Sequence, residues 1–127
     1  MKTLRLALIA LLGLAWLLPA QAQNTRMYNT VKTKLAAGEQ VVGGTVDTPD
    51  PEIYCAMANS GFDFIWIEMQ HSSLNYTDVA RMIWACRDAP AVPFIRIPNA
   101  TEGDIQKATD IGALGLIVPM VDTDRIH

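Results

Sequence analysis

Short apolar runs alternate with amphipathic segments along most of this chain. Four apolar runs, rich in β-branched and aromatic residues, have the length of β-strands. The segments between them repeat apolar residues at helical spacing, and capping residues or glycines mark their ends. The predicted strands are residues 40–46, 62–67, 92–97 and 114–118. The predicted helices are residues 29–37, a helix that opens at 48–51 and ends at 59–61, and residues 75–89 and 101–111.

This order predicts an α/β fold in which strands and helices alternate. The strands are apolar on both faces, which is typical of a parallel sheet covered by helices. A doubly wound sheet and four βα units of a (β/α)₈ barrel both fit the pattern. A complete barrel needs about 250 residues, so a chain of this length would supply half of one. In the helix after the first strand, we expect Ile53, Ala56 and Met57 to form the apolar face.

The start of the chain has the three parts of a secretory signal peptide. Two basic residues precede an apolar run over residues 6–18, and small residues at 20 and 22 mark a cleavage point. The run is short for a membrane span, which makes an uncleaved anchor the less favoured alternative. We therefore predict a signal peptide over residues 1–22 and a partial barrel domain over residues 23–127. We also predict a periplasmic or secreted location, with no membrane partner after cleavage.

Composition narrows the class of partner. Half of the 127 residues are apolar and 18% are charged, so the chain is neither disordered nor fibrous. The formal net charge is −3 at pH 7, and no run of Lys or Arg is present. Nothing therefore indicates a nucleic-acid partner.

Polar residues gather where the predicted strands end. Glu68, Gln70 and His71 follow the second strand, and Arg96 lies near the end of the third. The carboxyl ends of parallel strands meet at one edge of the sheet, so we expect His71 and Arg96 within about 10 Å of each other. His71 suits a general base, and Arg96 must meet a carboxylate of the protein or of a substrate acid. A hydrogen-bonded structural histidine and a structural salt bridge are the alternatives.

Asp110 is a third candidate. It stands near the end of the helix over residues 101–111, where a carboxylate opposes the helix dipole, so it either orients a base or is simply solvated. That helix returns toward the opposite edge of the sheet, and topology therefore places Asp110 away from His71.

Cys55 and Cys86 fall on apolar faces of two helices that should be neighbours. An oxidising compartment permits a disulfide, which needs Cα atoms within about 7 Å. We expect two buried free thiols, with the disulfide as the alternative.

Several segments resemble the HpcH/HpaI-type aldolases. Residues 61–71 resemble the second strand of that family and residues 94–98 its third. Residues 110–113 and 118–121 resemble the end of its third helix and its fourth strand. The resemblance covers nearly the whole chain after the leader, and it implies a (β/α)₈ TIM barrel of which this chain has about four βα units, the amino-terminal half.

The resemblance implies a metal-dependent cleavage of 4-hydroxy-2-oxo acids to a pyruvate-like product and an aldehyde. It implies that His71 is the catalytic base, that Asp110 orients it through a direct hydrogen bond, and that Arg96 binds the oxo acid. It also implies a divalent metal, Mg²⁺, Mn²⁺ or Co²⁺, whose Glu and Asp ligands lie on later strands that this chain lacks. No lysine stands at a strand end, which agrees with chemistry that needs no Schiff base.

Gln70 departs from the resemblance, because many family members have Glu immediately before the His. The alternative to an active aldolase is a truncated, catalytically inactive fragment or pseudoenzyme that at most binds an oxo acid through Arg96. A small α/β module that binds anions is a third interpretation. The sequence leaves the aldehyde and the oligomeric state open, a homo-oligomer included.

Overall fold

The computed structural model describes residues 28–122. Its four strands form one sheet in the order β1-β2-β3-β4, and every neighbouring pair is parallel. The sequential parallel sheet expected from the sequence is therefore confirmed. The predicted signal peptide lies outside the described residues. The strands are β1 (Gly43–Val46), β2 (Phe64–Glu68), β3 (Val92–Arg96) and β4 (Gly115–Ile117).

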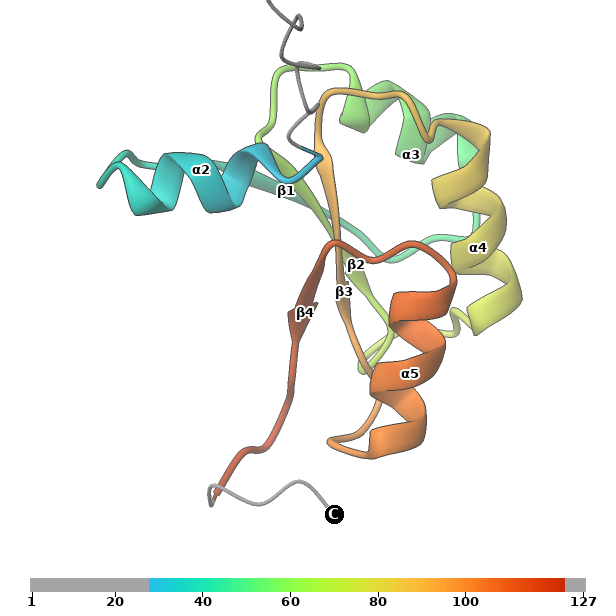
Figure 1. Cartoon of the computed structure of the whole chain (residues 1–127). Coiled ribbons are helices and arrows are strands. Elements are labelled where there is room, and N and C mark those ends of the chain that lie inside the picture. The colour runs from blue at the N-terminus through green and yellow to red at the C-terminus, as the bar shows by residue number, and fades with distance from the viewer. Residues whose placement is uncertain (1–27, 123–127) are drawn as a thin grey trace, which may run out of the picture.

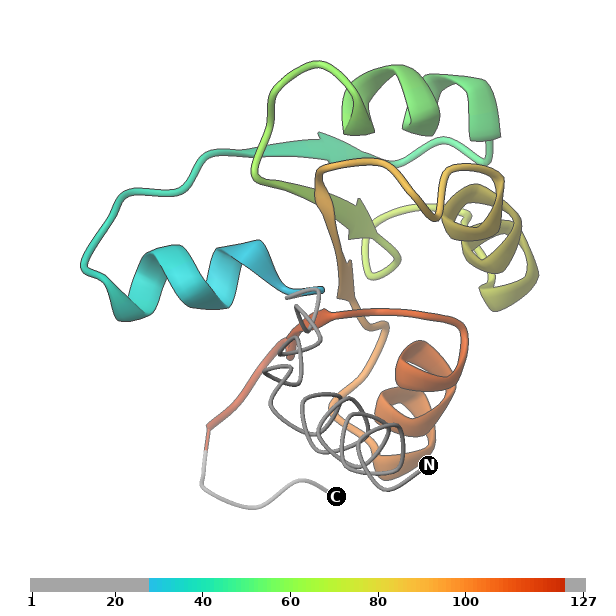
Figure 2. The same ribbon diagram turned by 45° about the horizontal axis from the view of Figure 1, so that its top comes forward.

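Of the four helices within residues 28–122, three lie side by side along one face of the sheet, and α2 lies on its other side (Figures 1 and 2). The Lys34 ammonium of α2 forms an ion pair with Asp63, which stands just before β2. Within the described range, no helix is long and apolar enough to span a membrane. The helices are α2 (Thr30–Ala36), α3 (Pro51–Ala58), α4 (Tyr76–Ala85) and α5 (Glu102–Asp110).

Local sequence sets the helix ends. The Asn75 side chain accepts hydrogen bonds from the first turn of α4, and the Asp78 carboxylate accepts one from the Asn75 backbone amide, so the two residues form a capping box. Thr101 caps α5 by accepting from the Asp104 amide at 3.2 Å. Glycines at positive φ follow α2 (Gly38, +76°) and α5 (Gly112, +112°). The helix predicted over residues 75–89 is shorter than expected, because α4 already ends at Ala85.

One face of the sheet packs under α3, α4 and α5, and we call it the covered face. Its isoleucines are fully buried, and α3 contributes Tyr54 and Ala58 to the same core. The apolar face predicted for α3 is wrong for Ile53, which is 45% exposed, and for Ala56, which is also exposed, whereas Met57 packs against the core as expected. That helix is apolar nearly all round, so periodicity alone did not identify its buried side. The core residues of the covered face are Val46, Ile65, Ile67, Ile95 and Ile97.

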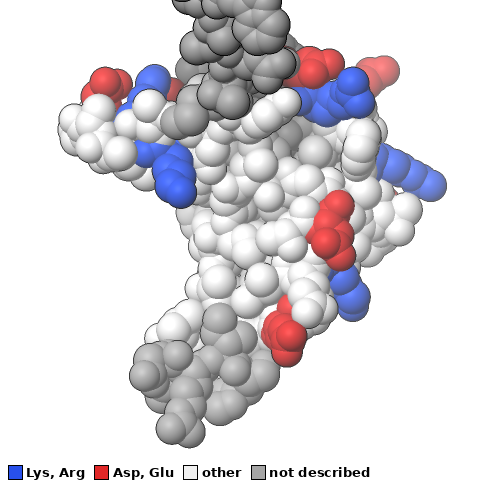
Figure 3. All heavy atoms as spheres, viewed as in Figure 1, with Lys and Arg blue, Asp and Glu red and all other residues white. Residues whose placement is uncertain are grey.

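The opposite face, which we call the open face, carries the alternate residues of each strand. Phe64 and Phe94 lie there with ring centroids 4.8 Å apart, and both are only partly buried. Gly43 and Gly115 leave room for these rings, since a Cβ would lie 2.2 Å from Phe64 and 2.4 Å from Phe94, respectively. In the view of Figure 3, the charged side chains lie mainly around the margin and the middle of the molecule is largely uncharged.

A disulfide joins Cys55 of α3 to Cys86 at the end of α4, with Cα atoms 5.5 Å apart. The expectation of two free thiols is therefore wrong. The two helices are neighbours on the covered face, and both cysteines are only partly buried there. Their separation lies within the usual range for a disulfide, which the spacing along the chain did not reveal.

Candidate active site at the carboxyl end of the sheet

The last residues of β2 and β3 place a carboxylate beside a guanidinium. Glu68 and Arg96 are direct partners in the parallel register, so their side chains leave the open face side by side. Glu68 Oε2 accepts a hydrogen bond from Arg96 Nη1 at 3.1 Å. Arg96 thus forms a salt bridge with a carboxylate of the protein, which the sequence analysis gave as the alternative to binding a substrate acid.

The Glu68 carboxylate is the centre of this edge. Oε1 accepts from the backbone amides of Gln70 at 2.8 Å and His71 at 3.0 Å. Oε2 accepts from the Trp66 indole at 3.2 Å as well as from Arg96. One carboxylate therefore anchors both the guanidinium and the start of the loop that carries His71.

Glu68 is ionised at neutral pH despite its environment. Burial opposes the charged form, since only 11% of its side chain is exposed. The hydrogen bonds from the His71 and Gln70 amides and from Arg96 outweigh burial, and they hold the pKa of Glu68 below its ordinary value. Both oxygens of the Glu68 carboxylate are thus occupied by hydrogen-bond donors of the protein itself.

Arg96 keeps binding capacity beyond Glu68. Its guanidinium lies 5.8 Å from the centroid of the Trp66 ring, and 26% of its side chain is exposed. Its Nε is buried and has no hydrogen-bond partner in the described structure, and the same holds for Gln70 Oε1. An orphaned donor and an orphaned acceptor therefore border the carboxylate, at the edge where a substrate would enter.

The His71 backbone is anchored, whereas its side chain is exposed. Ser72 stabilises the loop by donating its hydroxyl to the Glu68 carbonyl and accepting from the Leu74 amide at 3.1 Å. The imidazole makes no hydrogen bond within residues 28–122 and is open to a ligand or a partner. The shared carboxylate places the His71 backbone and the Arg96 guanidinium on one edge, within the predicted separation of about 10 Å.

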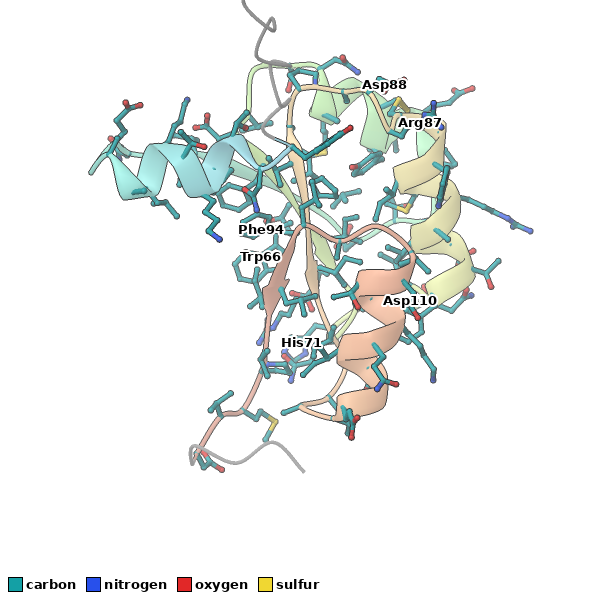
Figure 4. All side chains as sticks on the ribbon, viewed as in Figure 1. Trp66, His71, Arg87, Asp88, Phe94 and Asp110 are labelled. Atoms are coloured by element: carbon teal, nitrogen blue, oxygen red, sulfur yellow. A yellow bond between two sulfur atoms is a disulfide. The ribbon has the colours of Figure 1, made fainter. Side chains whose placement is uncertain are left out.

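Asp110 does not join this group. It is the last residue of α5, it is exposed, and Figure 4 shows it on the helix layer, to the side of His71 and apart from it. No hydrogen bond between the two residues forms within the described chain. The direct bond implied by the resemblance is therefore not present in one chain. Topology explains this, because α5 starts at the edge that carries His71 and runs away from it.

The described residues do not fit a divalent metal. No group of three or more His, Cys, Asp or Glu side chains among residues 28–122 is placed to hold an ion. Glu68 is the carboxylate that stands beside Arg96 and the His71 loop. Its two oxygens already accept four hydrogen bonds, all from donors of the protein. A metal ligated by this chain alone would have to displace these bonds.

Sequence reasoning placed Glu68 at this edge without assigning it a role, and it missed Trp66. Strand alternation was the signal available, because residues 66 and 68 of one strand must face the same side. Asp104 is a second, partly buried carboxylate, and it accepts from Tyr76 Oη at 2.7 Å and Thr101 Oγ1 at 2.8 Å. Its bonds tie α5 to α4 and fix the cap, so its role is structural.

The chain is similar to several characterised proteins, although no protein-family model matches it. It is 36% identical over 95 residues to a hydroxypyruvate/pyruvate aldolase of Rhizorhabdus wittichii, covering 75% of this chain and 38% of the relative. The solved citrate synthase SbnG is 36% identical, with a TM-score of 0.66 over 72% of this chain and 37% of that structure. An HpcH/HpaI aldolase/citrate lyase family protein from Burkholderia cenocepacia is 28% identical, with a TM-score of 0.69 over 75% of this chain and 38% of that structure. The chain spans less than two-fifths of the length of each.

Proposed function

We propose an aldolase function for this chain, which is a relative of the HpcH/HpaI-type aldolases and has four βα units of their barrel-like fold. The reaction is the cleavage of a 4-hydroxy-2-oxo acid to pyruvate, or a close relative of it, and an aldehyde. The observation that carries the proposal is the Glu68 carboxylate, which holds Arg96 and the His71 loop together at the carboxyl ends of β2 and β3.

Arg96 binds the oxo acid in this proposal. Glu68 occupies one guanidinium nitrogen, and the remaining N–H groups match the paired oxygens of a carboxylate or an oxo acid. The Trp66 ring and Glu68 keep the guanidinium in place. The substrate acid therefore meets a cation whose position is already set, which reduces the entropy lost on binding.

His71 acts as the base. Its neutral imidazole removes the proton of the 4-hydroxyl group, the bond between C3 and C4 breaks, and the electron pair passes to the oxo acid as an enolate. The aldehyde leaves, and a proton returns to C3 to give the pyruvate-like product. Asp110 has no access to His71 within one chain, so a second copy must supply it if it orients the base, which makes a homo-oligomer part of the proposal.

The divalent metal implied by the resemblance, Mg²⁺, Mn²⁺ or Co²⁺, would stabilise the enolate. The described residues supply no ligand set for it. The location is proposed as periplasmic or secreted, on the pattern of residues 1–22. The Cys55–Cys86 disulfide supports this location, because such bonds persist in oxidising compartments. Intact-mass measurement of the exported protein should show residues 1–22 removed.

The activity is tested by coupling pyruvate release to lactate dehydrogenase. The full chain is incubated with a 4-hydroxy-2-oxo acid and each of the three metals in turn. Substitution of Arg96 by Met should reduce pyruvate release at least tenfold, because the substrate loses its cationic partner. The matched control is Arg87→Met, which removes an exposed arginine at the opposite edge and should leave release unchanged.

Two outcomes contradict the proposal. Equal release by the Arg96 and Arg87 variants would remove Arg96 from the site. No release with any metal would refute the activity of this chain. Pyruvate titration followed by NMR then decides whether the chain still binds an oxo acid through Arg96, as an inactive fragment would.

A further inference from the structure

Gln70 carries a side-chain oxygen that the protein leaves without a donor. Its Oε1 is buried and has no hydrogen-bond partner among the described residues. An acceptor of this kind has lost its water and gained nothing in return, which is costly. The Gln70 side chain as a whole is only partly buried, so its amide group can turn toward a ligand at the edge that holds Glu68.

The backbone places Gln70 on the same side of the sheet as Glu68. The Met69 amide donates to the Arg96 carbonyl at 3.1 Å, which continues the pairing of β2 with β3 beyond Glu68. The Met69 side chain lies in the core of the covered face, so the alternation of strand residues turns Gln70 toward the open face. The Gln70 amide also donates to Glu68 Oε1 at 2.8 Å. Gln70 and Arg96 therefore border the same carboxylate.

The order of groups along an oxo acid assigns a carbon atom to Gln70. Arg96 holds the acid end, and its Nε, the other buried atom without a partner, is a donor that an oxygen of the acid would satisfy. His71, the next residue after Gln70, takes the proton of the 4-hydroxyl group in the proposed reaction. C3 lies between these two ends. An oxo acid without a substituent on C3 offers no polar donor there, whereas a 3-hydroxyl group offers one.

We propose, on the basis of the aldolase function above, that Gln70 determines specificity by favouring oxo acids with a hydroxyl group on C3. The 3-hydroxyl group donates to Gln70 Oε1, and the acid end binds Arg96. In a 3,4-dihydroxy-2-oxo acid, the 4-hydroxyl proton passes to His71, the bond between C3 and C4 breaks, and its electron pair stays with C3. Return of the proton to C3 then gives hydroxypyruvate, and the other fragment leaves as the aldehyde.

The test compares two acids of the same size, hydroxypyruvate and 2-oxobutyrate, which has a methyl group in place of the hydroxyl group. Each is titrated into the full ¹⁵N-labelled chain, and the Trp66 indole N–H signal is followed by NMR because that group donates to Glu68. The wild type should bind hydroxypyruvate about threefold to tenfold more tightly, which is the effect of one hydrogen bond.

Gln70→Met removes the acceptor and keeps the length of the side chain, so it should abolish this preference. Gln106→Met makes the same change at an exposed position of α5 and should leave the preference unchanged. Arg96→Met should weaken the binding of both acids, because it removes the cation that holds their common end. If Gln70→Met fails to fold, Gln70→Ala removes the acceptor without adding an apolar group, and the same loss of preference is expected.

Two results would overturn the role of Gln70 and leave the binding of oxo acids by Arg96 intact. The first is equal binding of the two acids by the wild type, with both lost in Arg96→Met. The second is equal weakening of both acids in Gln70→Met, which would show that Gln70 acts by positioning Arg96 and not by contact with C3. Binding of neither acid by the wild type would refute the proposed function together with this inference.

Discussion

The two faces of the sheet come from the same strands and carry different chemistry. On the covered face, Ile65, Ile67 and Ile95 are fully buried beneath three helices. On the open face, Trp66 and Phe94 are only partly buried, and the Glu68–Arg96 pair stands at its carboxyl end. Because strand residues alternate in direction, each strand supplies both faces at once.

The difference shows that the residues that stabilise the fold and the candidate site residues lie on opposite faces of the sheet. Aliphatic burial on the covered face needs no partner and stabilises the sheet. The buried carboxylate needs several donors, and the open face supplies them from an indole, a guanidinium and two loop amides. A change on one face should therefore affect stability, and a change on the other should affect charge and binding.

The largest effect is expected from truncating the same residue type on the two faces. Ile67→Ala should lower the free energy of unfolding by about 2–5 kcal/mol, because it leaves a cavity under the helices. Ile117→Ala, the matched change on the open face, should cost about 1 kcal/mol or less, because Ile117 is only partly buried. Urea unfolding monitored by circular dichroism measures both. Equal losses would show that something covers the open face in solution.

The next effect concerns the disulfide that joins the helices over the covered face. Reduction of Cys55–Cys86, or the double change to Ser, should destabilise the chain by about 2–4 kcal/mol, since it frees a loop with a sequence separation of 31. Thermal unfolding with and without reductant measures the loss. The open face has no such cross-link among the described residues, so the indole signal of Trp66 should change little while the chain stays folded. A change there would mean that the two faces are coupled.

The order of elements was predictable because it follows from local pattern. Apolar runs and capping signals identified the four parallel strands in sequence, and strand ends placed His71 and Arg96 on one edge. Topology also placed Asp110 away from His71, and the structure agrees with topology rather than with the pairing that the resemblance implied.

Side-chain partners were less predictable, because they depend on how helices rotate and approach in space. The apolar face of α3 was assigned to Ile53 although Tyr54 is the buried residue, since both flanks of that helix are apolar. The same uncertainty hid the approach of Cys55 to Cys86. Glu68 accepts four hydrogen bonds, and the one from Arg96 depends on the register of β2 against β3. That register cannot be deduced from either segment alone.

The smallest and most specific effect is expected at the carboxylate of the open face. Glu68→Gln leaves the Arg96 charge without its partner and weakens the anchor of the His71 loop. At neutral pH this should cost about 1–3 kcal/mol of unfolding free energy. The pKa of Glu68 is lower in the folded chain than its ordinary value of 4.5, so its stabilising contribution is present above that pH and is lost as the pH falls through the folded pKa.

The difference in stability between wild type and Glu68→Gln should therefore be constant near neutral pH and shrink below about pH 4.5. The pKa values of Asp63 and Asp104 are also lowered, but both residues are present in the wild type and in the variant. Their pH-dependent contributions to stability therefore cancel in this difference. Glu39→Gln makes the same chemical change at an exposed position and should give a small difference at every pH. Urea unfolding across pH 3–7 measures the profile. A difference that persists unchanged at low pH would mean that packing, and not the charge of Glu68, secures the open face.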